Sequence, residues 1–288
     1  METINKNPHP WRTELNDLIR GASGGFLFGM PFLYTMEVWW IGSSAHMIRL
    51  LMALLLTFVI VFMLNRTAGF RQTSDIRAID AVIDSVEALA IGIVCAGLML
   101  ILIQEITVQT PLNEAIGKVI YVSTPFTLGV ALASQFLSSQ EDEAQKNDDS
   151  ASNQATFNAT FSDIGSTLIG AIIIAFNIAP TDEIPTIAAA TGGLWLLAVM
   201  VASLLVSYAI VFAAGFTNQQ KRQKQEGIFQ HPYSETLISY LVSLLAACLM
   251  LVFFDKLHWQ DPWHLWLSYS IILGLPATIG GAAGRLAI

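Results

Sequence analysis

The sequence predicts an all-α fold, a polytopic membrane helix bundle with eight transmembrane helices arranged as two parallel four-helix repeats. Three observations lead to this prediction. Apolar residues make up 54% of the chain and charged residues only 12%, whereas an average soluble domain carries about 25% charged residues. Apolar runs of about 20 residues, long enough to cross a bilayer as a helix, recur along the chain. Two long stretches of the chain also match two others without gaps.

The apolar runs number eight. Because hydrocarbon offers the backbone no hydrogen-bond partner, each run is expected to form a helix. A transmembrane barrel is disfavoured, since its strands would be about ten residues long with alternating polarity. The predicted runs cover approximately residues 21–41, 47–65, 86–104, 115–137, 160–180, 187–214, 236–254 and 264–284.

The internal match covers much of the chain. A shift of 146 places residues 17–70 on 163–216, and a shift of 151 places residues 96–131 on 247–282. Four helices per copy is an even number, so both copies would enter the membrane from the same side. Their symmetry would then be a pseudo-two-fold axis along the membrane normal. Matched identities include Asp17/Asp163, Gly24/Gly170, Thr35/Thr181, Glu37/Glu183, Pro125/Pro276 and Thr127/Thr278.

The match divides the chain into three parts. We expect a first membrane repeat at 1–137, an acidic cytoplasmic linker at 138–157 and a second membrane repeat at 158–288. The linker is rich in Ser, Gln, Asn and Asp, which indicates a solvated, mobile connection or a regulatory acidic segment. Most Lys and Arg residues precede the first run or follow an even-numbered run, and this bias places both termini in the cytoplasm.

Glu37 and Glu183 are the leading candidates for a cation-binding site. Each follows a threonine, Thr35 or Thr181, by two residues near the outer end of the first helix of its repeat. Carboxylate and hydroxyl oxygens are hard ligands that suit cations such as Ca²⁺, Mg²⁺ and Na⁺, or a proton. The alternative is that both are interfacial carboxylates in contact with solvent, which the loop-like residues 182–185 favour.

Asp17 and Asp163 lie at the inner ends of the same two helices and could attract cations to the mouth of a pathway. Twenty residues separate Asp17 from Glu37, about 30 Å along a helix. On an ideal helix the two carboxylates point about 200° apart. Both would line one lumen only with a kink at Pro31 or unwinding at Pro180. As an alternative, an Asp at a helix start can be an N-cap.

A further group of acidic residues begins the third and seventh runs. Asp80, Asp84 and Glu87 share one helix face, and Glu235 begins the equivalent helix. Such a cytoplasmic cluster could sense Ca²⁺ or protons, or it could simply pair with Arg77 on the same face. The sequence does not identify a metal for any of these sites.

Pro125 and Pro276 interrupt the fourth and eighth runs at equivalent places. A proline removes one helical hydrogen bond and kinks the helix, and the freed carbonyl could accept from a hydroxyl such as that of Thr127 or Thr278. Such kinks could permit gating, or they could serve packing alone.

Small residues cluster in the first and fifth runs. They could seat helix against helix, or they could thin a helix so that an ion passes close to its backbone. They are Gly21, Ala22, Ser23, Gly24, Gly25, Gly29, Ser166, Gly170 and Ala171.

The first run and its flank resemble an uncharacterised family of bacterial integral membrane proteins that carries a domain-of-unknown-function label. The resemblance rests on Gly24-Gly25, Gly29, Thr35-Met-Glu37, Trp39-Trp40 and Ala68-Gly69-Phe70. It implies a multi-pass protein of the bacterial inner membrane, usually described with seven spans. It implies no activity and no functional residues.

The sequence favours a cation channel or a cation-coupled secondary transporter for H⁺, Na⁺, K⁺ or Ca²⁺. It contains no phosphate-binding loop and no hydrolase or zinc-protease motif, so we expect no enzyme, no cofactor and no nucleic-acid partner. The alternative is a membrane scaffold or sensor that acts through a cytoplasmic partner. Besides the lipid bilayer, we expect a homo-oligomer or a small membrane-protein partner. A water-filled central path would favour transport, and a dry, glycine-packed one would favour the scaffold.

Overall fold

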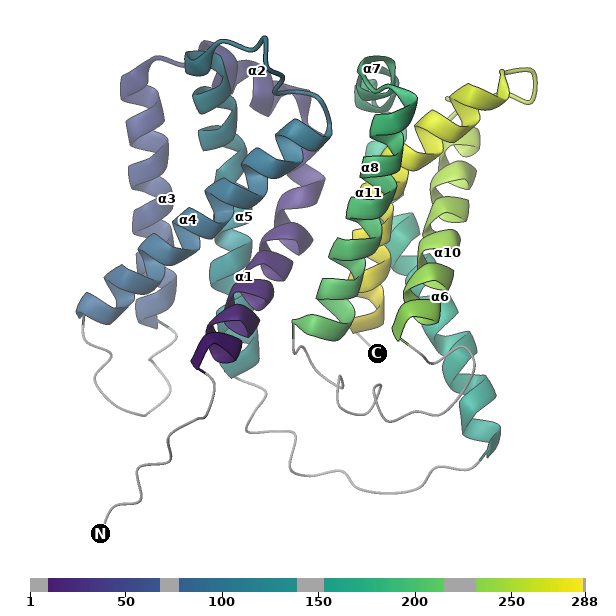
Figure 1. The fold of residues 1–288 in the computed structure, drawn as a ribbon, viewed down its shortest axis with the longest axis horizontal. Coiled ribbons are helices and arrows are strands. Elements are labelled where there is room, and N and C mark those ends of the chain that lie inside the picture. Colours follow the sequence, from purple (N-terminus) through teal and green to yellow (C-terminus); the bar gives the residue numbers. More distant parts are fainter. Residues whose placement is uncertain (1–9, 68–77, 139–152, 215–231, 287–288) are drawn as a thin grey trace.

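The structure, a computed structural model, describes residues 10–67, 78–138, 153–214 and 232–286. Within these ranges every regular element is a helix. The first half of the chain and the second half lie side by side (Figure 1). The first half contains α1 (Pro10–Leu33), α2 (Met36–Ser44), α3 (Met47–Thr67), α4 (Ala78–Leu102) and α5 (Leu112–Ser138). The second half contains α6 (Asn153–Ile178), α7 (Glu183–Ala190), α8 (Gly193–Tyr208), the π-helical turn η2 (Ala209–Ala213), α10 (Pro232–Phe253) and α11 (Trp263–Leu286).

Six helices of the described chain are long and apolar enough to cross a membrane, and a seventh crossing results if α6 and α7 form one span. These two helices meet at 90°. The eighth predicted crossing corresponds to α1. This helix is long enough to cross a membrane but not apolar enough, because it contains glycines, Asp17 and Arg20. The six are α3, α4, α5, α8 with η2, α10 and α11.

Two predicted runs are broken in the structure, and as single helices they were wrong. The run at 21–41 is divided between α1 and α2, because Thr35 adopts an extended conformation (φ −111°, ψ 101°). The run at 187–214 begins inside α7 and breaks at Thr191, which is also extended (φ −101°, ψ 115°). Threonine is β-branched and tolerates an extended backbone better than most helix-forming residues. Each half therefore carries a short helix, α2 or α7, at the same end of the bundle (Figure 1).

The turns after α4 and α10 have the same geometry. Gln104 (φ 63°) and Asp255 (φ 59°) are the described non-glycine residues with a left-handed backbone, and they stand 151 positions apart. The amide that follows each one donates to the helix carbonyl five residues back, Leu100 or Leu251. This shift is the one that relates the matched stretches 96–131 and 247–282.

Close glycine contacts seat the central helix of each half. An added Cβ on Gly24 of α1 would lie 2.6 Å from the carbonyl oxygen of Gly129 in α5. The equivalent atom on Gly170 of α6 would lie 2.2 Å from the carbonyl oxygen of Gly280 in α11. Helices in lipid associate through such small residues because their backbones can approach closely. At these positions the small residues therefore serve packing.

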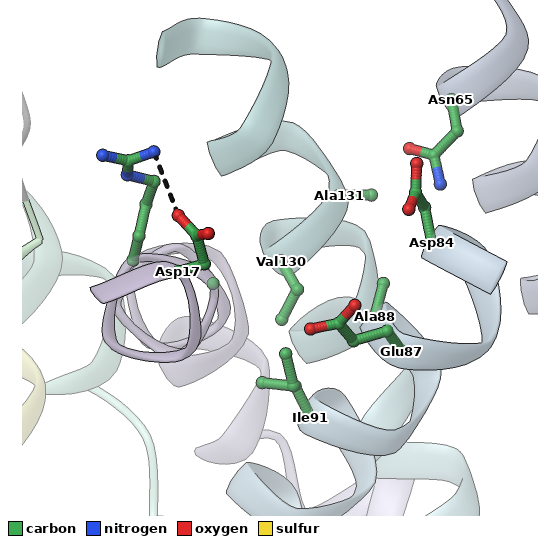
Figure 2. A pocket seen from close by; sticks show the side chains of 10 residues that line it. Asp17, Asn65, Asp84, Glu87, Ala88, Ile91, Val130 and Ala131 are labelled. Atoms are coloured by element: carbon green, nitrogen blue, oxygen red, sulfur yellow. Dashed lines mark hydrogen bonds and ion pairs between the residues drawn. The ribbon is translucent and has the colours of Figure 1, made fainter. Parts of the chain in front are cut away.

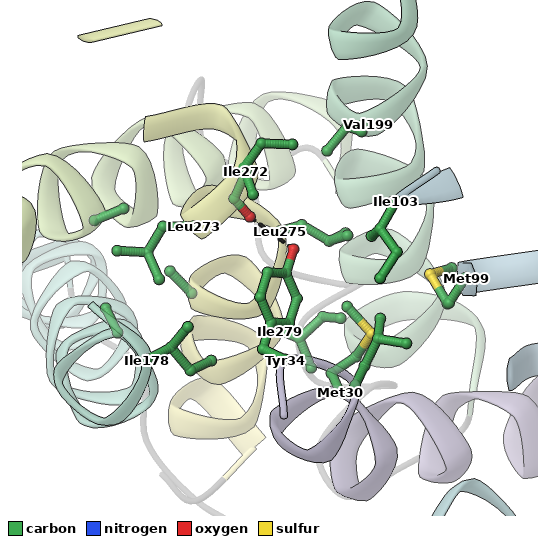
Figure 3. Close-up of a cluster of buried hydrophobic side chains, with 14 of the residues drawn as sticks. Met30, Tyr34, Met99, Ile103, Ile178, Val199, Ile272, Leu273, Leu275 and Ile279 are labelled. Atoms are coloured by element: carbon green, nitrogen blue, oxygen red, sulfur yellow. Dashed lines mark hydrogen bonds between the residues drawn. The ribbon is translucent and has the colours of Figure 1, made fainter. Parts of the chain in front are cut away.

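The two halves meet through buried apolar side chains. Figure 3 shows residues of α1, α6, α8 and α11 in one cluster, with Met30 and Tyr34 of the first half beside Ile178 and Ile279 of the second. Outward-facing apolar side chains are also abundant, above all on α3. A helix that is apolar outside as well as inside suits a lipid environment.

We expect Gly170→Ala to destabilise the protein, because the new methyl group would overlap the Gly280 carbonyl. Overpacking of this kind costs about 1–3 kcal/mol. Gly165, in the same helix, provides the matched control, since no described atom beyond the neighbouring backbone of its own helix lies within 4 Å of an added Cβ there. Gly165→Ala should be neutral or stabilising by up to about 1 kcal/mol. Unfolding by SDS titration in mixed micelles measures both, and equal stabilities would contradict the close contact.

Candidate functional site

Glu183 is a buried carboxylate at the junction of the two halves. It begins α7 and is 6% exposed. Its Oε1 atom accepts a 3.4 Å hydrogen bond from the amide of Met36, at the start of α2 in the other half. Its Oε2 atom is buried and has no hydrogen-bond partner among the described residues. A buried polar atom without a partner is energetically costly and marks a candidate binding site.

The other three residues of the predicted cation site are placed differently. Glu37 is exposed in the first turn of α2. Thr35 precedes that helix and makes no side-chain capping bond. The hydroxyl of Thr181 donates to the carbonyl of Ile178 at 2.7 Å, within its own chain segment. The structure thus brings Glu183 to the residue beside Glu37, and convergence of all four side chains on one cation stays a prediction.

Both lysines at this end of the bundle are already paired. Lys118 is buried and lies 3.3 Å from the carboxylate of Glu105 and 3.0 Å from that of Glu114. Lys256 pairs with Asp182 at 2.8 Å. Within the part of the chain that the structure describes, Glu183 makes no ion pair. A charge on this buried carboxylate would therefore need a proton or an external cation to compensate it.

Pro276 of α11 leaves a carbonyl that the other half of the molecule satisfies. Proline has no N–H, so the helical bond to the carbonyl four residues back, that of Ile272, is missing. The hydroxyl of Tyr34, at the end of α1, donates to this carbonyl at 2.8 Å (Figure 3). Tyr34 is 3% exposed, and this bond ties the first half to the kink of the second.

The predicted threonine partners do not fill this role, and that part of the prediction was wrong. The hydroxyl of Thr278 donates to the carbonyl of Gly274 at 2.6 Å. The hydroxyl of Thr127, two residues after Pro125, is buried without a partner among the described residues. Tyr34 was missed because nothing in the sequence links residues 238 positions apart. The available signal was a tyrosine inside an apolar run, since buried tyrosine hydroxyls usually find a partner.

The opposite end of the first half contains an acidic cavity of about 280 Å³. Figure 2 shows Asp17 of α1 on one side and Asp84 and Glu87 of α4 on the other. Asp17 pairs with Arg20 at 3.4 Å. The structure therefore joins a predicted pathway-mouth residue to the predicted acidic cluster, a proximity that sequence reasoning did not anticipate.

The remaining acidic candidates lie apart from this cavity. Asp80 is exposed at the start of α4. Asp163 begins the membrane portion of α6, where its backbone carbonyl accepts hydrogen bonds from two hydroxyl side chains. Glu235 forms an ion pair with Arg285 in the second half. Arg77, the predicted partner of the cluster, lies outside the described residues. No group of three or more His, Cys, Asp or Glu side chains in the described ranges could hold a metal ion.

The long apolar helices and their outward-facing apolar side chains define a multi-span integral membrane protein. The chain belongs to the family described as "Putative integral membrane protein (DUF2391)", whose family model matches residues 17–288. No curated protein and no solved structure matches the chain.

The Tyr34 bond can be tested with a double-mutant cycle. We expect Tyr34→Phe to destabilise the protein by about 1–3 kcal/mol, since a buried carbonyl loses its partner. Pro276→Ala restores an N–H that can bond the Ile272 carbonyl within α11. Removal of the tyrosine hydroxyl should then have a much smaller effect in the Pro276→Ala background.

Tyr269→Phe provides the control for the loss of a hydroxyl, because no hydrogen bond is seen at that hydroxyl among the described residues. SDS unfolding of the four variants and this control gives the coupling energy. A coupling energy near zero would show that Tyr34 does not compensate for the proline.

Proposed function

We propose that this protein is a cation-coupled membrane carrier in which Glu183 binds a proton or a hard cation. One observation carries the proposal: Glu183 is buried where the halves meet, and one of its carboxylate oxygens has no hydrogen-bond partner among the described residues. Ionisable residues at membrane depth are expensive and commonly mark ion pathways. A proton or a cation such as Na⁺ would supply the partner that the oxygen lacks.

The carrier would consist of two copies of one four-helix unit. The equivalent glycine contacts and the equivalent left-handed turns at Gln104 and Asp255 support this repeat. With α1 as an eighth crossing, both termini would lie on one side, the cytoplasmic side of a bacterial inner membrane. In keeping with this, the start of α1 and the end of α11 lie at the same end of the bundle (Figure 1).

A carrier fits the interface between the halves better than a permanently open channel does. The described contact surface is filled by apolar side chains such as Met30, Ile178 and Ile279. Water and ions do not pass a packed apolar core, so transport requires the halves to move against each other. The kink at Pro276, held by Tyr34, is a position where such a movement would break and re-form a single hydrogen bond.

The same dry, glycine-packed interior favours the second candidate, a membrane scaffold or sensor with a cytoplasmic partner. The helix backbones are in close contact at Gly24 and Gly170, which favours a rigid helix bundle such as a scaffold would need. This candidate predicts no ion flux and a partner protein that is lost when residues 138–157 are deleted. That linker lies largely outside the described residues.

Flux measurements in proteoliposomes distinguish the two candidates. We expect H⁺ or Na⁺ flux through the wild-type protein, with K⁺ and Ca²⁺ compared in the same assay. Glu183→Gln should abolish the flux because the amide keeps the shape of the side chain and removes its charge. Glu37→Gln should have a smaller effect, since Glu37 is exposed.

Asp255→Asn is the matched control, because Asp255 is an exposed carboxylate in the turn after α10. Wild-type flux in the Glu183→Gln variant would refute the site. Absence of flux for every cation in the wild-type protein would favour the scaffold.

A further inference from the structure

The second half contains a buried arginine whose charge is paired within that half. Arg285 of α11 is 1% exposed and forms an ion pair with Glu235 at the start of α10. Its guanidinium also donates to the hydroxyl of Ser239 at 2.9 Å and lies 5.6 Å from the ring centre of Phe212. A carboxylate, a hydroxyl and an aromatic ring thus surround one guanidinium group.

The first half has the carboxylate at the equivalent position but lacks the arginine. The shift of 151 that relates the later helices of the halves takes Glu235 to Asp84 and Arg285 to Ser134. Position 134 lies on α5, three and four residues after Ala131 and Val130, which line the acidic cavity. Residues at these spacings share a helix face. If the two halves are copies of one unit, as proposed above, the cavity lies where the Arg285 side chain lies in the other half.

The lining of the cavity suits a positively charged ligand. Asp17, Asp84 and Glu87 contribute carboxylates, and Arg20, which pairs with Asp17, contributes the single positive charge among the described lining residues. Neither Asp84 nor Glu87 forms an ion pair with a described Lys or Arg. Asn65 of α3 faces Asp84 (Figure 2) and adds an amide.

The arrangement of these groups favours an organic cation over a metal ion. In the described ranges no three acidic, His or Cys side chains lie close enough to hold a metal. The walls between the carboxylates are apolar, formed by residues such as Ile91 and Val130. A guanidinium spreads its N–H donors over a plane and is weakly hydrated, so it pairs with carboxylates beside apolar surface.

We propose that this cavity binds a small organic cation with N–H donors, of the guanidinium or primary alkylammonium class. Asp84 holds the cation in the first half as Glu235 holds the Arg285 guanidinium in the second. Arg285 supports this assignment independently, because its guanidinium pairs with Glu235, the residue matched to Asp84. The assignment rests on the repeat proposed above and is independent of transport, because Glu183 lies at the other end of the bundle.

Agmatine, which carries a guanidinium and an ammonium group, is the probe for this site. We expect saturable binding of agmatine to the purified wild-type protein in nanodiscs, measured by titration calorimetry. Methylguanidine should compete. Choline should not compete, because it has no N–H donor, and Mg²⁺ should not compete at the same concentration. Asp84→Asn should weaken binding by about tenfold or more, as expected for loss of a charge-assisted bond.

Ser134→Arg tests the equivalence with the second half directly. The introduced guanidinium should occupy the cavity, so that agmatine no longer binds while the protein keeps or gains thermal stability. Asp255→Asn, at an exposed carboxylate outside the cavity, should bind agmatine like the wild-type protein. If Ser134→Arg fails to fold, Asp84→Asn still decides whether the carboxylate holds the ligand.

The outcomes separate this proposal from the proposed transport. Agmatine binding that is lost in Asp84→Asn and Ser134→Arg but intact in Glu183→Gln supports the cavity, whatever the flux shows. Absence of saturable agmatine binding to the wild-type protein overturns it. Binding that survives in Ser134→Arg overturns the equivalence with Arg285, and competition by Mg²⁺ overturns the class of ligand.

Discussion

The close backbone contact of glycines is the constraint on which the rest of this structure depends. Gly24 against Gly129, and Gly170 against Gly280, let α1 and α6 lie almost directly on the central helices α5 and α11. Apolar side chains give little driving force for association in lipid, so close van der Waals contact must provide it. Once these pairs are seated, the ends of α1 and α6 are fixed, and so are the short helices α2 and α7 that follow them.

Several side-chain hydrogen bonds also connect the two halves. Tyr34 donates to the carbonyl that Pro276 leaves free, and Trp195 donates to the carbonyl of Leu102 at 2.6 Å. Arg20 donates to the carbonyl of Ala214 at 3.2 Å. In each case a side chain of one half binds a backbone carbonyl of the other. Glu183 differs, because its side chain accepts a hydrogen bond from the backbone amide of Met36, and its second oxygen has no partner in the described part of the chain.

Sequence reasoning predicted the helical membrane class and the approximate position of most helices, because apolar runs of bilayer length leave few alternatives. It failed at Thr35 and Thr191, where an extended residue breaks a run whose composition is continuous. It singled out Glu183 through the internal match, but the unequal burial of Glu183 and Glu37 could not be predicted. Burial depends on how the two halves pack, and the shared Thr-x-Glu spacing of the two sites does not encode that difference.

The turn η2 at the end of α8 is a point at which the two halves differ. The π-helical turn brings Phe212 beneath Arg285, whereas the matching helix α3 ends as a regular α-helix. Two identical subunits related by symmetry must carry the same residue at both matching positions. If the two halves are copies of one unit, as proposed, they are free of that rule, so one half can contain a buried arginine where the other has an acidic cavity. Under that proposal, joining the two copies in one chain lets matching positions differ in charge, which a symmetric dimer of identical subunits does not allow.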